Sequence, residues 1–369
     1  MKCKVYSEHV LGASHLAKGE TCEDYALSHA DDGCAIIIVS DGHGDKRSFR
    51  AADGARMACE GTMGILKQYI GKTEDVLKKL EVSKGKFFSD LQGLVLNTWF
   101  EKVAADFSAR KFSDDELGAL KDKDREYYQG NEKRHAKAYG CTLIAAFVAP
   151  SFWFCLQIGD GKCTVCYEGG TWANPLPEGQ GQLLNITNSL CQTDAIEKFV
   201  HFFEKKSPLG VFVATDGVDE SFPPLETSLK LAHFYREISG PFFKGEQDAQ
   251  EALKGRLGRL TKEGSGDDVS VAAAICAETP LAEPKFLRSQ LEAALEEVVM
   301  KIEGKRSSLR NNANALRQAE EELRTGEDRL SELKAEIERT KKIKADNEAE
   351  LSAMQKNKED IEFQLSEMV

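Results

Sequence analysis

Two stretches of the sequence place an aspartate directly after an apolar run. The first is Val211-Phe-Val-Ala-Thr-Asp-Gly-Val-Asp-Glu220, and the second is Ile36-Ile-Ile-Val-Ser-Asp-Gly-His-Gly44. Short apolar runs rich in β-branched residues indicate buried strands, and the glycine after each aspartate allows a sharp turn. A carboxylate at the end of a buried strand is costly unless it is hydrogen-bonded or binds a cation. Two such strand ends therefore indicate a site.

The order of predicted elements around these stretches favours packed sheets with helices outside them, rather than a parallel doubly wound fold. Strands are predicted over 2–10, 25–29, 34–40, 141–148, 152–158, 163–168, 199–203, 211–214 and 269–276. Helices are predicted over 46–70, 87–107, 225–238 and 248–261. The short separators 149–151 and 159–162 predict an antiparallel meander of the three strands between 141 and 168.

A charged segment, residues 108–138, interrupts this pattern with runs such as Asp114-Asp-Glu116 and Lys121-Asp-Lys-Asp-Arg-Glu126. It is predicted to form an exposed helix-loop excursion, because it contains few apolar residues at a regular spacing.

The composition changes at Pro280 and Pro284, and the chain beyond them is rich in Glu, Lys, Leu and Ala. We therefore expect a domain over 1–277, a linker over 278–285 and a coiled coil over 286–369. Leucine or isoleucine recurs every seventh residue at 295, 302, 309, 316, 323, 330 and 337, which is typical of a coiled coil. One helix of about 80 residues would extend about 120 Å, whereas Gly304 and Gly326 also allow a folded-back hairpin.

The bulk composition excludes some functions. The 369-residue chain has a net charge of −12, which argues against a nucleic-acid partner. No apolar run reaches the roughly 18 residues of a membrane helix, and the N-terminus lacks a signal-peptide pattern, so no membrane partner is expected. The ten scattered cysteines, several of them in apolar runs, predict reduced thiols in a cytoplasmic protein.

Four acidic groups stand at strand ends or turns: Glu23-Asp24, Asp41, Asp216 and Asp267-Asp268. Converging carboxylates repel one another and take up protons unless a cation neutralises them. Ligation by oxygen alone favours Mg²⁺ or Mn²⁺ over zinc. Two such ions could activate a water for attack on phosphorus.

These residues resemble the metal-dependent protein phosphatases of the 2C type over roughly residues 8–277. The matching motifs are Cys22-Glu-Asp24, Ser40-Asp-Gly-His-Gly44, Gly140-Cys-Thr142, Ile158-Gly-Asp160, Ala214-Thr-Asp-Gly217 and Gly266-Asp-Asp-Val-Ser270. The opening Gly12-Ala-Ser-His15 is most similar to bacterial members. The resemblance implies an α+β fold, a β-sandwich of two antiparallel sheets flanked by helices. It also implies hydrolysis of phosphoserine and phosphothreonine in a phosphoprotein substrate, with two Mn²⁺ or Mg²⁺ ions and a bridging water.

The resemblance also implies roles for individual residues. Asp41 would bridge both ions, with the Gly42 carbonyl as a further ligand. Asp216 and Asp267 would complete the ligands of one ion, and Glu23 would serve the other. Asp24 would orient metal-bound water, and His43 would act as general acid. Asp160 matches a ligand of a third, weaker metal.

The sequence departs from the family pattern at two places. Many members have an arginine before the Glu-Asp pair that holds the phosphate, whereas this chain has Leu16-Ala-Lys-Gly-Glu-Thr-Cys22. Lys18 and His15 are the candidates to replace it, although lysine lacks the two-pronged geometry of arginine. Glu220 stands where the family often has an aspartate, and its longer side chain could ligate a third ion or leave that site empty.

Simpler interpretations remain open at several residues. Asp-Gly after a strand is a common turn, Gly-Asp-Gly around Asp160 is a good hairpin turn, and His43 could be an exposed loop histidine. His15 and Lys18 could be structural or solvated. Two alternative functions also remain, namely a catalytically inactive phosphatase fold that binds partners, and a scaffold that acts or self-associates through its coiled coil.

Overall fold

The computed structural model describes residues 3–129, 132–177, 187–222, 227–243, 246–282, 288–325 and 330–366. The chain divides into two compact units. The first comprises residues 1–222 and 227–285, and the second contains residues 286–369, called the helical tail below. The predicted domain, linker and coiled-coil bounds stay predictions.

The first unit contains two five-stranded sheets whose neighbouring strands are all antiparallel. The first sheet has the order β1-β10-β9-β6-β7, with bounds Lys4–Val10, Val269–Ile275, Gly210–Ala214, Lys162–Cys166 and Trp172–Ala173. The second has the order β2-β3-β4-β5-β8, with bounds Tyr25–Asp31, Cys34–Ser40, Leu143–Val148, Trp153–Ile158 and Val200–Glu204.

Strand β3 shows why the sequence produces a layered core. Its seven residues are all buried, because the strand is covered on both faces. Ile37 and Val39 belong to a cluster shared with Val211 and Val213 of the other sheet. Ile36 and Ile38 face the opposite way, into a cluster with side chains of the outer helices. The alternation of side chains along a strand thus fills two apolar layers from one continuous run.

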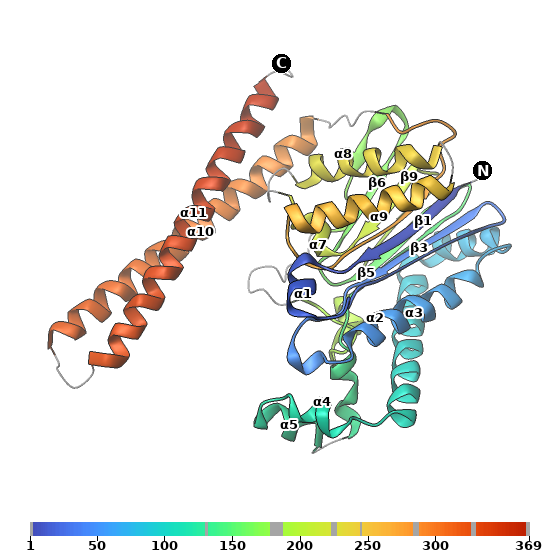
Figure 1. Ribbon diagram of the computed structural model, residues 1–369. Helices are drawn as coiled ribbons and strands as arrows, with labels where there is room; N and C mark the ends of the chain where they lie inside the picture. Colours follow the sequence, from blue (N-terminus) through green and yellow to red (C-terminus); the bar gives the residue numbers. More distant parts are fainter. Residues whose placement is uncertain are drawn as a thin grey trace. The chain divides into compact units, whose positions relative to one another are not determined.

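Helices cover both outer faces of the sandwich (Figure 1). Helices α2 (Ala51–Lys67) and α3 (Thr73–Ala109) pack on the second sheet, with Trp99 and Phe88 fully buried. Helices α8 (Thr227–Ser239) and α9 (Glu246–Glu263) lie over the first sheet (Figure 1), where Tyr235 stacks on Phe212 of β9. The predicted α-β-β-α sandwich is therefore confirmed.

The predicted three-stranded meander is wrong at its second turn. Strand β6 pairs with β9 and β7, not with β5, so residues 159–161 carry the chain from one sheet to the other. Gly159 has a φ of +115°, and a side chain at Gly161 would clash with the Ala214 carbonyl. A crossing between packed sheets needs this close backbone approach, so glycines here do not mark a hairpin turn.

The helix boundaries also differ from the prediction. The predicted helix 46–70 consists of a 3-10 turn, η1 (Lys46–Ser48), followed by α2. The predicted helix 87–107 is the second part of α3, which is interrupted at Ser83, where φ is −156° and ψ is 81°. The short elements α1 (Ala13–Lys18), α6 (Ala195–Lys198), α7 (Asp216–Asp219), η3 (Glu168–Gly170) and η5 (Gly240–Phe243) were not predicted.

The charged segment forms α4 (Asp114–Gly118), α5 (Asp122–Gln129) and η2 (Glu132–Tyr139), and it is less exposed than predicted. Arg50, only 4% exposed, donates to both carboxylate oxygens of Glu116, at 2.7 and 2.9 Å. The same guanidinium donates to the Tyr139 hydroxyl at 2.6 Å. Phe112 and Tyr128 of the segment pack edge-on against each other and against Phe49. A buried arginine and an aromatic cluster therefore fix the segment to the domain.

The prediction that all ten cysteines are reduced is wrong for one pair. Cys3 and Cys276 form a disulfide, and the other eight cysteines are free. The pairing follows from the register of β1 and β10, in which Lys4 lies opposite Ile275, so Cys3 and Cys276 occupy the next cross-strand position.

The helical tail contains two long helices, α10 (Arg288–Thr325) and α11 (Leu330–Ser366). One apolar cluster joins Val298 and Ile302 of α10 to Met354 and Ile361 of α11, and a second joins Leu316 and Ala319 to Leu333 and Ile337. The start of α10 thus packs against the end of α11, so the tail is a folded-back hairpin. Gly326, where the turn was expected, lies outside the described residues. Among the described helices, none has a stretch apolar and long enough to span a membrane.

Candidate metal centre

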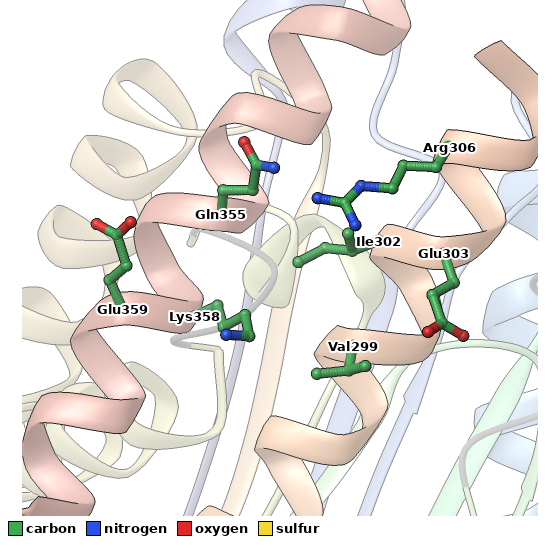
Figure 2. Close-up of a pocket in the computed structure, with 7 residues that line it drawn as sticks. All are labelled: Val299, Ile302, Glu303, Arg306, Gln355, Lys358 and Glu359. Atoms are coloured by element: carbon green, nitrogen blue, oxygen red, sulfur yellow. The ribbon is translucent and has the colours of Figure 1, made fainter. Parts of the chain in front are cut away.

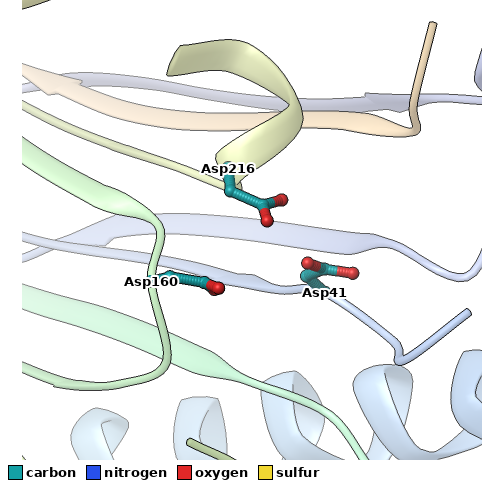
Figure 3. A group of neighbouring side chains, drawn as sticks. All are labelled: Asp41, Asp160 and Asp216. Carbon is teal, nitrogen blue, oxygen red and sulfur yellow. The ribbon is translucent and has the colours of Figure 1, made fainter. Parts of the chain in front are cut away.

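Three aspartates from different parts of the chain converge in the first unit (Figure 3). Carboxylate oxygens of Asp41, Asp160 and Asp216 lie within 4.8 Å of one another. Asp41 follows β3, Asp160 lies in the crossing from β5 to β6, and Asp216 begins α7 directly after β9. We call these three residues the acidic cluster. Its members come from the ends of strands in both sheets.

Asp41 is held in place by the segment 140–142. The Asp41 N–H donates to the Thr142 hydroxyl at 3.0 Å, and the Thr142 N–H donates to the Asp41 carbonyl at 2.8 Å. Gly42 forms a β-bridge with Cys141, and the His43 N–H donates to the Gly140 carbonyl at 3.1 Å. A Cβ atom at Gly42 would lie 2.7 Å from the Glu23 carbonyl, so only glycine fits there.

Asp216 is fixed by its neighbours in β9 and β10. The Thr215 hydroxyl donates to the buried Asp24 carboxylate at 2.7 Å and accepts from the Ser270 N–H at 3.0 Å. Asp24 therefore lies beneath the cluster, bonded to the residue that precedes Asp216. On the other side, the Thr187 hydroxyl donates to Asp160 at 2.5 Å.

The cluster is electrostatically strained without a cation. Burial raises the pKa of both Asp41 and Asp216 well above the ordinary value, and neighbouring carboxylates raise each pKa further. Burial also raises the pKa of Asp24 to about 7 and that of Glu23 to about 8. One oxygen of Glu23 is buried and has no hydrogen-bond partner within the described part of the chain. An all-carboxylate set of this kind, with an orphaned oxygen beside it, fits Mg²⁺ or Mn²⁺.

Comparison with known proteins places the chain in a family. The sequence model of the family described as "Protein phosphatase 2C" matches residues 11–258. The chain belongs to the protein phosphatase 2C family. The match runs from the helix α1 region into α9 and includes Asp41, Asp160 and Asp216. No curated protein sequence matches the chain significantly.

Solved structures with a similar arrangement include phosphatases from bacteria. PppA, described as a key regulatory component of the type VI secretion system of Pseudomonas aeruginosa, is 12% identical, with 74% of this chain and 98% of that chain covered and a TM-score of 0.44. The Mycobacterium tuberculosis serine/threonine phosphatase PstP/Ppp is 13% identical, with 74% and 99% covered and a TM-score of 0.44. The PstP catalytic domain in complex with two manganese ions is also 13% identical, with 74% and 98% covered and a TM-score of 0.44.

The other metal ligands expected from the phosphatase 2C family lie near the acidic cluster but do not join it at the same spacing. Glu23 donates its N–H to Asp268 at 2.7 Å. Asp267, with a side chain 48% exposed, lies 3.5 Å from His15. Glu220 is exposed at the end of α7, and burial followed by the charges of Asp267 and Asp160 raises its pKa. Ligand roles for Glu23, Gly42, Asp267 and Glu220 stay predictions.

The two residues proposed to hold the phosphate both contact carboxylates. His15 Nδ1 lies 3.0 Å from Asp268 Oδ1, and its Nε2 lies 3.5 Å from Asp267 and 3.9 Å from Glu20. Lys18 has a side chain 62% exposed and lies 3.8 Å from Glu20. Both side chains therefore have anionic neighbours in this structure, and their phosphate-binding roles stay predictions.

His43 lies beside the backbone of Gly140, where a Cβ atom would come within 2.8 Å of the imidazole Cδ2. Burial lowers the pKa of His43, and the Lys137 ammonium lowers it further, while Asp160 opposes both effects. A neutral imidazole next to the acidic cluster can exchange protons with a water or alkoxide there. Its role as general acid stays a prediction.

The sequence reasoning missed several polar residues of this region. Thr142, Thr187 and Thr215 orient the cluster or its supports through hydroxyl groups. Asp219 has a buried oxygen without a partner among the described residues, and burial raises its pKa to about 7 although Lys162 opposes this. The run Asp216-Gly-Val-Asp-Glu220 already contained Asp219, but only the fold shows that it points inward.

The helical tail has a cavity that is separate from the acidic cluster. A cavity of about 410 Å³ lies between α10 and α11 and is lined by Val299, Ile302, Glu303, Arg306, Gln355, Lys358 and Glu359 (Figure 2). It contains none of the predicted site residues. Its polar lining carries both signs of charge, so it does not select an anion or a cation.

Proposed function

We propose that this chain hydrolyses phosphoserine and phosphothreonine in phosphoproteins, using two Mn²⁺ or Mg²⁺ ions and a bridging water. The observation that carries the proposal is the convergence of Asp41, Asp160 and Asp216 within 4.8 Å. Membership of the phosphatase 2C family supports the reaction class. The manganese complex described for the PstP catalytic domain supports the choice of metal.

Some residues of the chain would bind the metal ions, and others would orient bound water or transfer protons. Asp41, Asp216 and Asp160, with Glu23, Asp267 and Glu220 nearby, would hold the ions, while Asp24 would orient bound water. When bound, the ions would lower the pKa of that water and neutralise charge that develops on the phosphoryl group. His43 would protonate the leaving alkoxide.

Hydrolysis of a phosphothreonine peptide with and without Mn²⁺ tests the proposal. We expect metal-dependent turnover that falls by about 100-fold or more in Asp216→Asn, because the variant loses a charged ligand of the cluster. Asp115→Asn, at an exposed aspartate of α4, is the matched control and should keep full activity. Wild-type protein without any Mn²⁺- or Mg²⁺-dependent turnover would sink the proposal.

The second candidate is a catalytically weak phosphatase fold that acts as a binding module. It is favoured by the family arginine missing from residues 16–22 and by the carboxylates that engage His15 and Lys18. Calorimetric titration with Mn²⁺ separates the two candidates. Metal binding without turnover supports the binding module, and robust turnover eliminates it.

We further propose that the helical tail mediates self-association or docks a partner protein. Met300 and Phe363, which are 61% and 62% exposed on the hairpin, support this. Light scattering tests this proposal, because it measures the mass of the particles that the full-length chain forms. The predicted cytoplasmic location stays a prediction, and the Cys3–Cys276 disulfide weighs against a strongly reducing compartment.

A further inference from the structure

We propose that Lys137, delivered by the charged segment, supplies the cation that binds the substrate phosphate beside the acidic cluster. This inference rests on the proposed phosphatase function, and it assigns the phosphate-binding task that the absent arginine leaves open. It differs from the sequence-based candidates, Lys18 and His15.

The backbone ties Lys137 to the loop that carries Asp41. Lys137 lies in η2, three residues before Gly140, and its carbonyl accepts from the Ser48 hydroxyl and the Gly140 N–H, both at 3.3 Å. The Gly140 carbonyl in turn accepts from the His43 N–H. Lys137 is therefore placed by the same short segment that clamps residues 41–43.

The Lys137 ammonium contacts a thiol that lies close to both Gly140 and His43. Lys137 Nζ is 3.9 Å from Cys191 Sγ. A Cβ atom at Gly140 would be 3.1 Å from that same sulfur and 2.8 Å from the His43 ring. The Cys191 thiol, which the Lys137 ammonium contacts, and the His43 imidazole thus both lie against Gly140.

The loop that carries Cys191 connects this group to the acidic cluster. At one end of the loop, Thr187 donates to Asp160, and the Gln192 amide donates to the Thr187 carbonyl at 3.5 Å. In its middle, the Leu190 N–H and the Ser189 hydroxyl donate to the Cys141 carbonyl at 3.0 and 3.1 Å. The contact point of Lys137 is therefore attached to both Asp160 and the segment 140–142.

Lys137 differs from nearby cations in its partners. Within the described residues no carboxylate lies within 4.0 Å of its ammonium, whereas Arg47 pairs with Asp45 at 2.8 Å and Arg50 with Glu116 at 2.7 Å. Besides burial, which raises the pKa of Asp45, and Arg47, which lowers it, the Lys137 ammonium also lowers this pKa, so Asp45 is an anion in its field. A partly buried lysine that forms no ion pair within the described residues, on a segment tied to the acidic cluster, suits a phosphate dianion.

The simpler alternative is a structural role, in which the aliphatic stem of Lys137 only packs against the 189–191 loop. Lys137→Met separates the two, because methionine keeps an unbranched apolar stem and removes the charge. Lys137→Arg keeps the charge. Lys123→Met, at an exposed lysine of α5, removes a charge from the same segment and serves as the control.

The experiment measures Mn²⁺-dependent hydrolysis of a phosphothreonine peptide and its competitive inhibition by inorganic phosphate, on the full-length chain. For Lys137→Met we expect KM and the inhibition constant of phosphate to rise roughly tenfold, because a charge-assisted hydrogen bond is lost. Mn²⁺ affinity and the melting temperature should stay at wild-type values. Lys137→Arg should restore most of the phosphate affinity, and Lys123→Met should match wild type.

Unchanged KM and phosphate inhibition in Lys137→Met overturn the inference while the phosphatase function stands. Equal losses in Lys137→Met and Lys137→Arg, accompanied by a lower melting temperature, also overturn it, because they show a structural role. If wild-type protein has no turnover, the proposed function fails, and calorimetric titration of phosphate into the Mn²⁺-loaded protein decides the inference. Binding about tenfold weaker in Lys137→Met supports it, and equal or absent binding overturns it.

Discussion

Because Gly217 has no side chain, helix α7, which begins at Asp216, can lie directly against the start of β10. A Cβ atom at Gly217 would clash with the Asp268 carbonyl, so the first turn of α7 rests directly on the backbone of residue 268. Asp268 itself accepts from the Gly12 N–H at 2.6 Å and the Glu23 N–H at 2.7 Å. Asp268 therefore links Glu23 and the residue before α1 through its carboxylate, and it supports α7 through its backbone carbonyl.

Gly217→Ala should consequently weaken both the fold and the metal centre. We expect a loss of about 1–3 kcal/mol in the free energy of unfolding, because the added methyl group forces α7 away from β10. We expect Mn²⁺ affinity to fall about tenfold, because Asp216 moves with α7. Thermal unfolding and calorimetric titration measure the two effects.

Gly258→Ala in α9 is the matched control, since nothing lies within 4 Å of its added Cβ atom. It should stabilise the protein by about 0.5–1 kcal/mol, because alanine favours a helix interior. Wild-type metal affinity in Gly217→Ala would show that α7 does not fix Asp216 in the way described.

At the scale of elements, the ion pair between Arg50 and Glu116 is one of the contacts that fix the charged segment to the domain. Although burial raises the pKa of Glu116, hydrogen bonds and charge from Arg50 outweigh it and lower the pKa from 4.5 to about 2. Glu116 therefore stabilises the folded protein above its unfolded pKa, and this contribution is lost as the pH falls through the folded value. The Glu116 side chain is 27% exposed, so solvent weakens the pair.

Glu116→Gln should lower the free energy of unfolding by about 1–2 kcal/mol at pH 7. The difference from wild type should shrink from about pH 4.5 downward, because Glu116 takes up a proton near pH 4.5 in the unfolded chain and only near pH 2 in the folded protein. Urea unfolding at pH 7, 4 and 3 measures it. Glu126→Gln, at an exposed carboxylate of α5 without an ion pair among the described residues, should show no difference. A gap that persists unchanged at pH 3 would contradict the assignment.

The crossing at residues 159–161 shows where local sequence signals fail at this scale. Gly-Asp-Gly between two apolar runs predicts a hairpin, and the same residues suit a crossing between sheets. Strand pairing is set by packing far along the chain, because β6 finds its partner in β9, some fifty residues later. This crossing is also what brings Asp160 to Asp41 and Asp216. The turn that was misread is therefore part of the candidate site.

At the scale of the whole molecule, the sequence predicted best those features in which a residue type has a single physical role, as apolar residues have in burial. The apolar runs before Asp41 and Asp216 predicted buried strands, and the sandwich with outer helices was confirmed. Contacts that depend on strand register were not predicted. An example is the Cys3–Cys276 disulfide, which follows only from the pairing of β1 with β10. Lys137 was not predicted as a site residue for a similar reason. A lysine in a charged segment has no local signature, and only the fold places it near His43.

The helical tail gives the last prediction. Its hairpin buries apolar heptads between its own helices, and its middle contains polar contacts, Lys305–Glu350 at 2.6 Å and Asn347–Ser308 at 3.5 Å. Such polar layers fix the register of paired helices at a cost in stability. The buried face is therefore occupied within the chain, and association must use other residues. Among the described side chains of the tail, Met300 and Phe363 are the most exposed large apolar ones.

We expect light scattering to give a mass above the 40.8 kDa of one chain. The double substitution Met300→Glu with Phe363→Glu should return the mass to that of a monomer, because charges replace the apolar contacts. Val82→Glu, at a position 86% exposed on α3 in the first unit, should leave the wild-type mass unchanged. A chain ending at residue 285 should also be monomeric and keep its Mn²⁺ affinity, because the first unit has its own apolar clusters. The proposed role of the tail is wrong if the full-length protein has the mass of a monomer and binds the same partners in a pull-down as the shortened chain.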